Sequence, residues 1–175
     1  MNESKGTSIE QLIKVMKRLR HPTEGCPWDR EQTFSSVAPY TVEEAYEVED
    51  AIARNDLDAI REELGDLLLQ IVFHARMAEE AGHFDFDAVT ESVTRKIIER
   101  HPHVFGEENQ RTQDFHSEAW EEQKTRERQA KSDGSQGILD DVAESLPALM
   151  RSGKLVKRVM SAGCDPTSPE TVLVE

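Results

Sequence analysis

Two stretches of helical periodicity, separated only by Asn55-Asp56, constrain the fold of this chain most strongly. Apolar side chains recur every three or four positions over residues 41–53, and the pattern resumes at Leu57 and continues to Gly82, a good C-terminal cap. Two helices joined by so short a turn are expected to pack antiparallel. We find no segment with strand periodicity and no internal repeat, so the sequence predicts an all-α fold.

Two further helices complete a four-helix-bundle-like domain. Residues 8–20 are amphipathic with Ser8 as a possible cap, and a later helix begins at Asp85 or Asp87 and ends at His101-Pro102. The intervening segment 23–39 contains Gly25, Pro27 and Pro39 and shows no sustained period, so we expect an ordered loop with a helical turn near Phe34.

The rest of the chain is predicted to form further helices and a linker outside that four-helix domain. A fifth helical stretch is expected at about 114–130, and the apolar residues after Gly137 predict one or two helices broken by Pro147. The expected organisation is a domain over 1–130, a linker over 131–137, a helical segment over 138–163 and a coil tail over 164–175.

The negative net charge limits the classes of ligand that this chain is expected to bind. Lys plus Arg number 21 and Asp plus Glu number 35, which gives a formal net charge of −14. Such a chain is a poor binder of nucleic acid or anionic membrane, and an anionic substrate would need a metal ion as intermediary. No apolar run approaches the roughly 20 residues that cross a bilayer, and the N-terminus lacks the apolar core of a signal peptide, so a cytoplasmic location is expected.

Two acidic motifs lie on the two adjacent helices. They are Glu43-Glu44-x-x-Glu47 and Glu62-Glu63-x-x-Asp66, and residues three apart share a helix face, roughly 4.5 Å apart along the axis. If the helices pack antiparallel, four carboxylates converge. Hard oxygen ligands of this kind suit Mg²⁺ or Mn²⁺ rather than zinc.

A plainer interpretation stands beside the metal site. A chain with 35 acidic residues places glutamates on helix faces by chance, and such pairs are usually just solvated. Thr41 and Glu44 also have the spacing of a capping box, which would engage Glu44 with a backbone N–H instead of a metal. Gly65 is expected to permit close helix approach beside the site.

Several motifs in order resemble the MazG family, the all-α nucleoside triphosphate pyrophosphohydrolases. Besides the acidic motifs, the resemblance rests on four segments spread over the chain: Cys26-Pro27-Trp28-Asp29, Ala38-Pro39-Tyr40-Thr41, Glu63-Leu64-Gly65-Asp66-Leu67-Leu68 and Arg100-His101-Pro102-His103-Val104-Phe105. The resemblance implies hydrolysis of a nucleoside triphosphate (NTP or dNTP) between its α and β phosphates, with Mg²⁺ as cofactor and Mn²⁺ as a possible substitute.

The resemblance also implies residue roles. Glu44, Glu47, Glu63 and Asp66 match the metal ligands, and Glu43 matches an acidic residue that orients or deprotonates the attacking water. For the substrate, Lys96 and Arg100 match phosphate-binding positions with Arg61 as a weaker candidate, Trp120 matches an aromatic that stacks on the base, and Trp28 could line the pocket. As plainer alternatives, the basic residues are surface charges and the two tryptophans are packing anchors.

Two functions of different class therefore remain open. Longer family members carry two such domains in tandem, so this chain is either a pyrophosphohydrolase that removes unwanted triphosphates or a metal- or nucleotide-binding module that dimerises and regulates a second catalytic domain. Retention of Glu43 favours the enzyme. A homodimer or a higher homo-oligomer is expected because short polar-faced helices gain core by pairing, whereas the preferred base cannot be read from the sequence.

Overall fold

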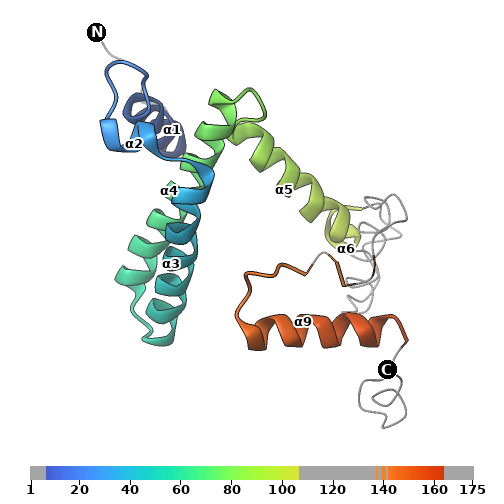
Figure 1. The fold of residues 1–175 in the computed structure, drawn as a ribbon. Helices are drawn as coiled ribbons and strands as arrows, with labels where there is room; N and C mark the ends of the chain where they lie inside the picture. The colour runs from blue at the N-terminus through green and yellow to red at the C-terminus, as the bar shows by residue number, and fades with distance from the viewer. Residues whose placement is uncertain (1–6, 107–136, 138, 141, 164–175) are drawn as a thin grey trace. The chain divides into compact units, whose positions relative to one another are not determined.

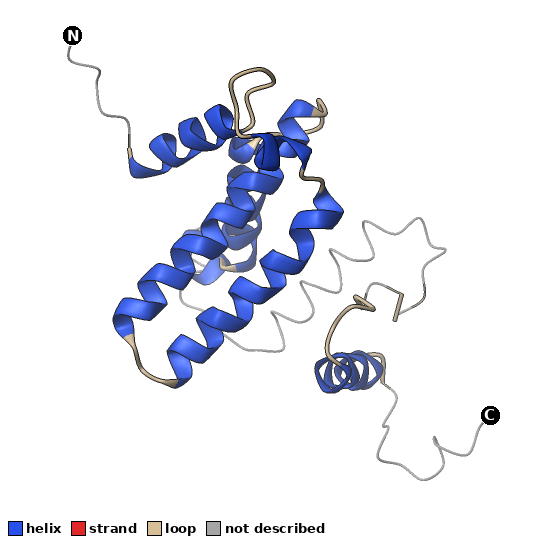
Figure 2. Ribbon diagram, turned by 60° about the vertical axis from the view of Figure 1, so that its left-hand side comes forward, coloured by secondary structure: helices blue, strands red, loops and turns tan. Residues whose placement is uncertain are grey.

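The computed structural model describes residues 7–106, 137, 139–140 and 142–163, and these residues form helices and no strand (Figures 1 and 2). The helices are α1 (Ser8–Leu19), α2 (Pro27–Glu31), α3 (Phe34–Ala53), α4 (Leu57–Glu80), α5 (Phe86–Arg100), α6 (Pro102–Phe105) and α9 (Ala148–Ser161). The chain divides into two compact units, residues 1–105 and 106–175. The predicted all-α fold is confirmed. None of the described helices is long and apolar enough to cross a membrane.

The first unit is built on an antiparallel hairpin of α3 and α4 (Figure 1). Asn55 has a positive φ of 53°, and the amides of Asn55 and Asp56 donate to the carbonyls of Ile52 and Ala51. This is a Schellman motif, which closes the C-terminus of α3. The Asp56 carboxylate then caps α4 by accepting from the Ala59 amide at 3.1 Å. The predicted turn and cap are confirmed.

The start of α3 differs from the prediction. The helix begins at Phe34 rather than near residue 41, because Thr33 and Ser36 form a reciprocal capping box at 2.9 and 3.2 Å. Pro39 lies inside the helix, where it removes one backbone hydrogen bond in the second turn but does not end it. The segment expected as a loop also contains the short helix α2.

Other boundaries follow the prediction closely. The cap of α1 is Thr7 rather than Ser8, since its hydroxyl accepts from the Glu10 amide while the Glu10 carboxylate accepts from the Thr7 amide. Asp85 caps α5, and Gly82 has a positive φ of 74° just after α4. The short helix α6 after Pro102 was not predicted.

The buried core lies where the C-terminal half of α4 meets α1 and the start of α3. Its fully packed members come from three helices: Met16, Val37, Val72, Phe73 and Met77. Partly buried apolar residues of α1, α4 and α5 pack against it: Ile9, Leu12, Ile13, Leu69 and Phe86. We call this region the core end of the hairpin.

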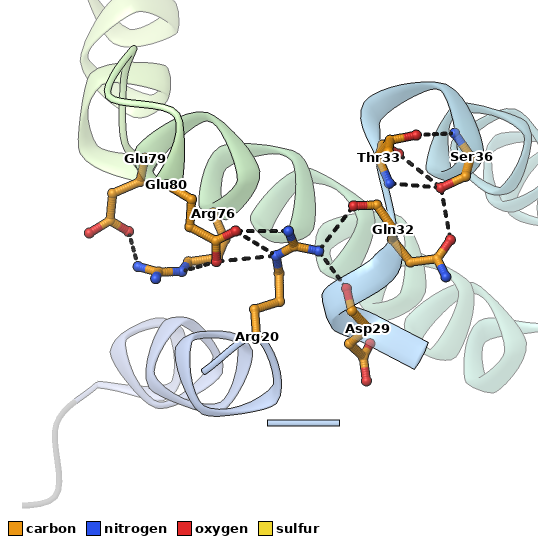
Figure 3. Close-up of polar contacts among 8 residues, drawn as sticks. All are labelled: Arg20, Asp29, Gln32, Thr33, Ser36, Arg76, Glu79 and Glu80. Atoms are coloured by element: carbon orange, nitrogen blue, oxygen red, sulfur yellow. Dashed lines mark hydrogen bonds and ion pairs between the residues drawn. The ribbon is translucent and has the colours of Figure 1, made fainter. Parts of the chain in front are cut away.

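Arg20, at the end of α1, forms hydrogen bonds with α4 and with the α2 region beside the core end (Figure 3). Its guanidinium binds the Glu80 carboxylate through Nη2 at 2.7 Å and Nε at 3.0 Å, and donates to the carbonyls of Asp29 and Gln32. It also lies 5.3 Å from the centre of the Phe73 ring. Arg76 donates to Glu80 Oε1 at 2.8 Å, and the Arg20 guanidinium links the end of α1 to α2 and α4.

Helix α5 leaves the hairpin soon after it begins (Figure 1). Phe86 packs on the core, but α5 contains no buried residue, and the side chains of Val93, Ile97 and Ile98 are 40–48% exposed. In the described part of the first unit, α5 therefore contacts α4 at its start and presents its apolar residues to solvent.

The second unit contributes α9, which begins after Pro147 as predicted. The helix expected at 114–130, residues 131–136 of the linker and the tail 164–175 lie outside the described residues. The proposed domain boundaries stay predictions.

Candidate metal centre

Three carboxylates meet between α3 and α4. Glu44 of α3 and Glu63 and Asp66 of α4 each offer an oxygen, and the three oxygens lie within 4.8 Å of one another. Glu44 and Glu63 are partly buried and Asp66 is exposed. We call these three residues the carboxylate cluster; the antiparallel hairpin assembles it from two motifs that are 19 residues apart, from Glu44 to Glu63.

The cluster carries a clear electrostatic signature. Desolvation raises the pKa of Glu44, and the negative charges of Asp66 and Glu47 raise it further. Desolvation also raises the pKa of Glu63, with added repulsion from Glu47 and Asp66. Like charges held this close destabilise one another unless a cation or a proton neutralises them.

Glu47 lies beside the cluster. It raises the pKa of Glu44, and its charge also raises the pKa of Glu63 on the other helix of the hairpin. All four residues expected as metal ligands are therefore close enough to influence one another. Glu43 is exposed and lies four residues before Glu47, on the same side of α3.

The expected conflict between capping and metal binding does not arise. Thr41 lies inside α3, so it forms no capping box with Glu44, and the Glu44 carboxylate stays available to the cluster. The Thr41 hydroxyl instead lies 3.0 Å from His74 Nε2 and 3.4 Å from the Val37 carbonyl. His74 stacks on Phe34 with ring centres 5.7 Å apart, and partial burial lowers the pKa of His74.

The expectation for Gly65 was wrong. A Cβ atom built on it would meet nothing within 4 Å, so no helix approaches α4 closely at this position in the described structure. Gly65 is exposed, between Glu63 and Asp66 in the sequence.

The predicted substrate residues come from other elements. Lys96 and Arg100 lie on the diverging helix α5, and Trp28 lies on α2 beside the core end with 55% of its surface exposed. Arg61 pairs with Asp58 at 3.1 Å on the exposed surface of α4. Trp120 lies outside the described residues. The hairpin thus brings the acidic residues together, and the roles of these four residues stay predictions.

The sequence interpretation missed Arg54. Its Nε lies 3.2 Å from Asp50 Oδ2, and its positive charge lowers the pKa of Glu63, opposing the desolvation and the three acids that raise it. The sequence spacing could have indicated it, because Arg54 follows Glu47 by seven residues and therefore lies on the same face of α3.

Comparison with known proteins places these helices in a family context. Residues 32–105, which include α3 to α6, match the MazG nucleotide pyrophosphohydrolase domain. The chain is 51% identical to a nucleoside triphosphate pyrophosphohydrolase of Escherichia coli (strain K12), over 91% of this chain and 60% of that protein. It is 39% identical to the nucleoside triphosphate pyrophosphohydrolase/pyrophosphatase MazG of Thermotoga maritima, over 95% of this chain and 62% of that protein.

A solved structure is also similar to this chain. The crystal structure of a mazG-related protein from Thermotoga maritima superposes with a TM-score of 0.53 and 30% sequence identity, covering 66% of this chain and 98% of that one. The chain spans about 60% of the length of the two curated relatives named above.

Proposed function

Because the chain belongs to the MazG nucleotide pyrophosphohydrolase family, we propose that it hydrolyses nucleoside triphosphates between the α and β phosphates, releasing a monophosphate and pyrophosphate. The observation that carries the proposal is the carboxylate cluster, in which three oxygens lie within 4.8 Å of one another. We place the reaction in the cytoplasm, where its substrates are held.

The cluster fits a hard divalent cation. Its donors are all carboxylate oxygens, which Mg²⁺ and Mn²⁺ prefer, and the repulsion that helps to raise the pKa values of Glu44 and Glu63 is of the kind that a bound cation relieves. Glu44, Glu63 and Asp66 would hold Mg²⁺, with Glu47 as a fourth ligand or as the group that orients Glu44. When bound, the ion would neutralise charge on the phosphate oxygens and acidify a coordinated water.

Glu43 is the proposed base. Its carboxylate is exposed beside Glu47 and outside the group of three, so it keeps its lone pairs for a water proton. Lys96 and Arg100, four residues apart on α5, are proposed to bind phosphate oxygens, while Trp28 and Trp120 are proposed to contact the base.

We further propose that the working form is a homodimer. Large apolar side chains lie exposed along α4 and α5 of the first unit: Leu64 at 50%, Leu68 at 36%, Val93 at 48% and Ile97 at 40%. Large apolar side chains left exposed along helices are typical of subunit interfaces. Sedimentation or light scattering of the wild type and of Leu64→Lys tests this, and a wild-type monomer at high concentration contradicts it.

The test of activity is pyrophosphate release from a panel of NTPs and dNTPs, with Mg²⁺ and with EDTA. We expect metal-dependent release that Glu63→Gln abolishes and that Glu62→Gln, the adjacent acidic residue outside the cluster, retains. Mg²⁺ binding by calorimetry without turnover of any nucleotide would contradict the enzyme and favour the regulatory module.

A further inference from the structure

The α3–α4 hairpin is short of positive charge where a triphosphate would bind. Over residues 34–80 it contains three arginines and no lysine. Arg76 is engaged with Glu79 and Glu80 at the core end. Arg61 precedes Glu63 by two residues, so the two side chains point about 160° apart around the axis of α4. Arg61 pairs there with Asp58. Arg54 differs from both.

The turn between the helices fixes the backbone of Arg54. It is the C-terminal cap of α3, and its own amide donates to the Asp50 carbonyl at 3.0 Å. The Schellman motif of Asn55 and Asp56 follows at once, and Asp56 caps α4. Arg54 is therefore anchored at the junction of the two helices that supply the carboxylate cluster.

The side chain of Arg54 leans toward the cluster. Side chains on a helix tilt toward its N-terminus, which for Arg54 is the direction of Asp50 and then Glu47, two turns away on the same face. The ion pair with Asp50 shows this direction, since Nε lies 3.2 Å from Oδ2. Glu63 follows the α4 cap Asp56 by seven residues, so it lies about as far from the turn along α4 as Glu47 does along α3.

The ion pair leaves Arg54 free to change partner. The side chains of Arg54 and Asp50 are 57% and 67% exposed, and exposed ion pairs contribute little stability. A guanidinium offers five N–H donors in a planar fork that matches a phosphate better than a single carboxylate oxygen. A polyphosphate at the cluster would therefore compete well against Asp50.

We propose that Arg54 binds the phosphates of the substrate, with Asp50 holding its guanidinium beside the carboxylate cluster until the substrate arrives. This inference rests on the proposed function, because it assumes a polyphosphate ligand at the cluster. It assigns Arg54 a binding role and makes Asp50 its resting partner, which competes with the substrate for the guanidinium.

The two residues of the pair give opposite predictions. Inorganic tripolyphosphate with Mg²⁺ is titrated by calorimetry into the full chain and its variants. Arg54→Gln should weaken binding about tenfold, because a charge-assisted hydrogen bond is lost. Asp50→Asn should strengthen it severalfold, because it removes the competing anion. Arg54→Lys should recover part of the loss.

The matched control is Arg18→Gln, which makes the same charge change on the exposed face of α1 and should shift binding less than about twofold, since distant exposed charges are screened. Thermal unfolding checks that every variant is folded. A merely structural ion pair predicts that Arg54→Gln and Asp50→Asn act alike, and that result overturns the inference.

Two more results would overturn it: loss of binding in Arg61→Gln but not in Arg54→Gln, or no tripolyphosphate binding by the wild type. Nucleotide turnover is measured separately. If turnover is absent but the binding order holds, the proposed function fails and the role of Arg54 stands. If turnover is present but the order fails, only the role of Arg54 is lost.

Discussion

At the core end of the hairpin, the guanidinium groups of Arg20 and Arg76 enclose the carboxylate of Glu80 above buried apolar side chains. At the carboxylate cluster, Glu44, Glu63 and Asp66 face one another across the same two helices. Burial alone would raise the pKa of Glu80, but the hydrogen bonds and charges of Arg20 and Arg76 outweigh it and lower that pKa. The pKa values of Glu44 and Glu63 are raised.

The difference separates stability from function along one pair of helices. The core end has its charges neutralised within the chain, so it stabilises the fold without any ligand. The carboxylate cluster leaves its repulsion to be relieved from outside, and exposed apolar residues such as Leu64 lie nearby. Sites that bind ligands commonly retain strain of this kind.

The largest effect should come from the core end. Phe73→Ala removes a ring that is 5% exposed and stacked under Arg20, and we expect a loss of about 3–5 kcal/mol in the free energy of unfolding. Urea unfolding followed by circular dichroism measures it. Leu57→Ala, at a side chain 80% exposed, should cost no more than about 0.5 kcal/mol. If Phe73→Ala does not fold, Phe73→Leu should show a smaller loss. Equal losses at both sites would remove the distinction.

The Arg20 contacts come next. Arg20→Met keeps most of the apolar stem but leaves Glu80 and two backbone carbonyls without this donor, and we expect a loss of about 3 kcal/mol. Lys17→Met is the control, since Lys17 pairs with Glu79 at 3.9 Å on the exposed surface and should cost less than about 1 kcal/mol. Similar urea midpoints for the two variants would refute the role given to Arg20.

At the cluster the effect should depend on metal. Saturation with Mg²⁺ at about 100 times its Kd should stabilise the wild type by about 2.7 kcal/mol. Glu44→Gln should lose most of this gain, yet melt no lower than the wild type in EDTA, because one repelling charge is gone. Thermal melts with and without Mg²⁺ measure both effects, with Glu91→Gln on the exposed surface of α5 as control. A lower melting temperature for Glu44→Gln in EDTA would contradict the electrostatic account.

The smallest effect is a pair of opposite pH dependences. The lowered pKa of Glu80 contributes stability that is present above the ordinary value of 4.5 and is lost as pH falls through the lower folded value. The raised pKa values of Glu44 and Glu63 mean that the folded chain binds protons more tightly, so stability without metal falls as pH rises above 4.5. Melts from pH 3 to 8 test this at roughly unit steps. Glu80→Gln should reduce the loss of stability at acidic pH, and Mg²⁺ should reduce the loss of stability as pH rises above 4.5.

The sequence predicted the hairpin and its acidic residues well because the signals are local. Periodicity located α4, Asp56 capped it, and the spacing of Glu63 and Asp66 put both on one face. The predicted start of α3 was wrong because two pairs, Thr33-Ser36 and Thr41-Glu44, have the spacing of a capping box. Pro39 favoured a start at Thr41. The structure uses the Thr33–Ser36 box, which places Val37 on α3 within the buried core, and this long-range packing is not visible in the sequence.

Contacts between distant segments were beyond prediction. Arg20 and Glu80 are sixty residues apart, so nothing in the local pattern pairs them. The direction of α5 depends on how Phe86 meets the core, which leaves the roles of Lys96 and Arg100 as predictions. Arg54 could have been found, because its spacing from Glu47 is as regular as that of the acidic residues.

The tight turn at Asn55 also bears on the order in which the chain folds. Glu44 and Glu63 meet by closing a helical hairpin of nineteen residues, whereas Met16 and Phe73 must close a loop of fifty-seven. Short loops close faster and at lower entropic cost than long ones. We expect the two halves of the carboxylate cluster to approach each other before the core end is complete, so divalent cations in the refolding buffer should accelerate folding as well as stabilise the product.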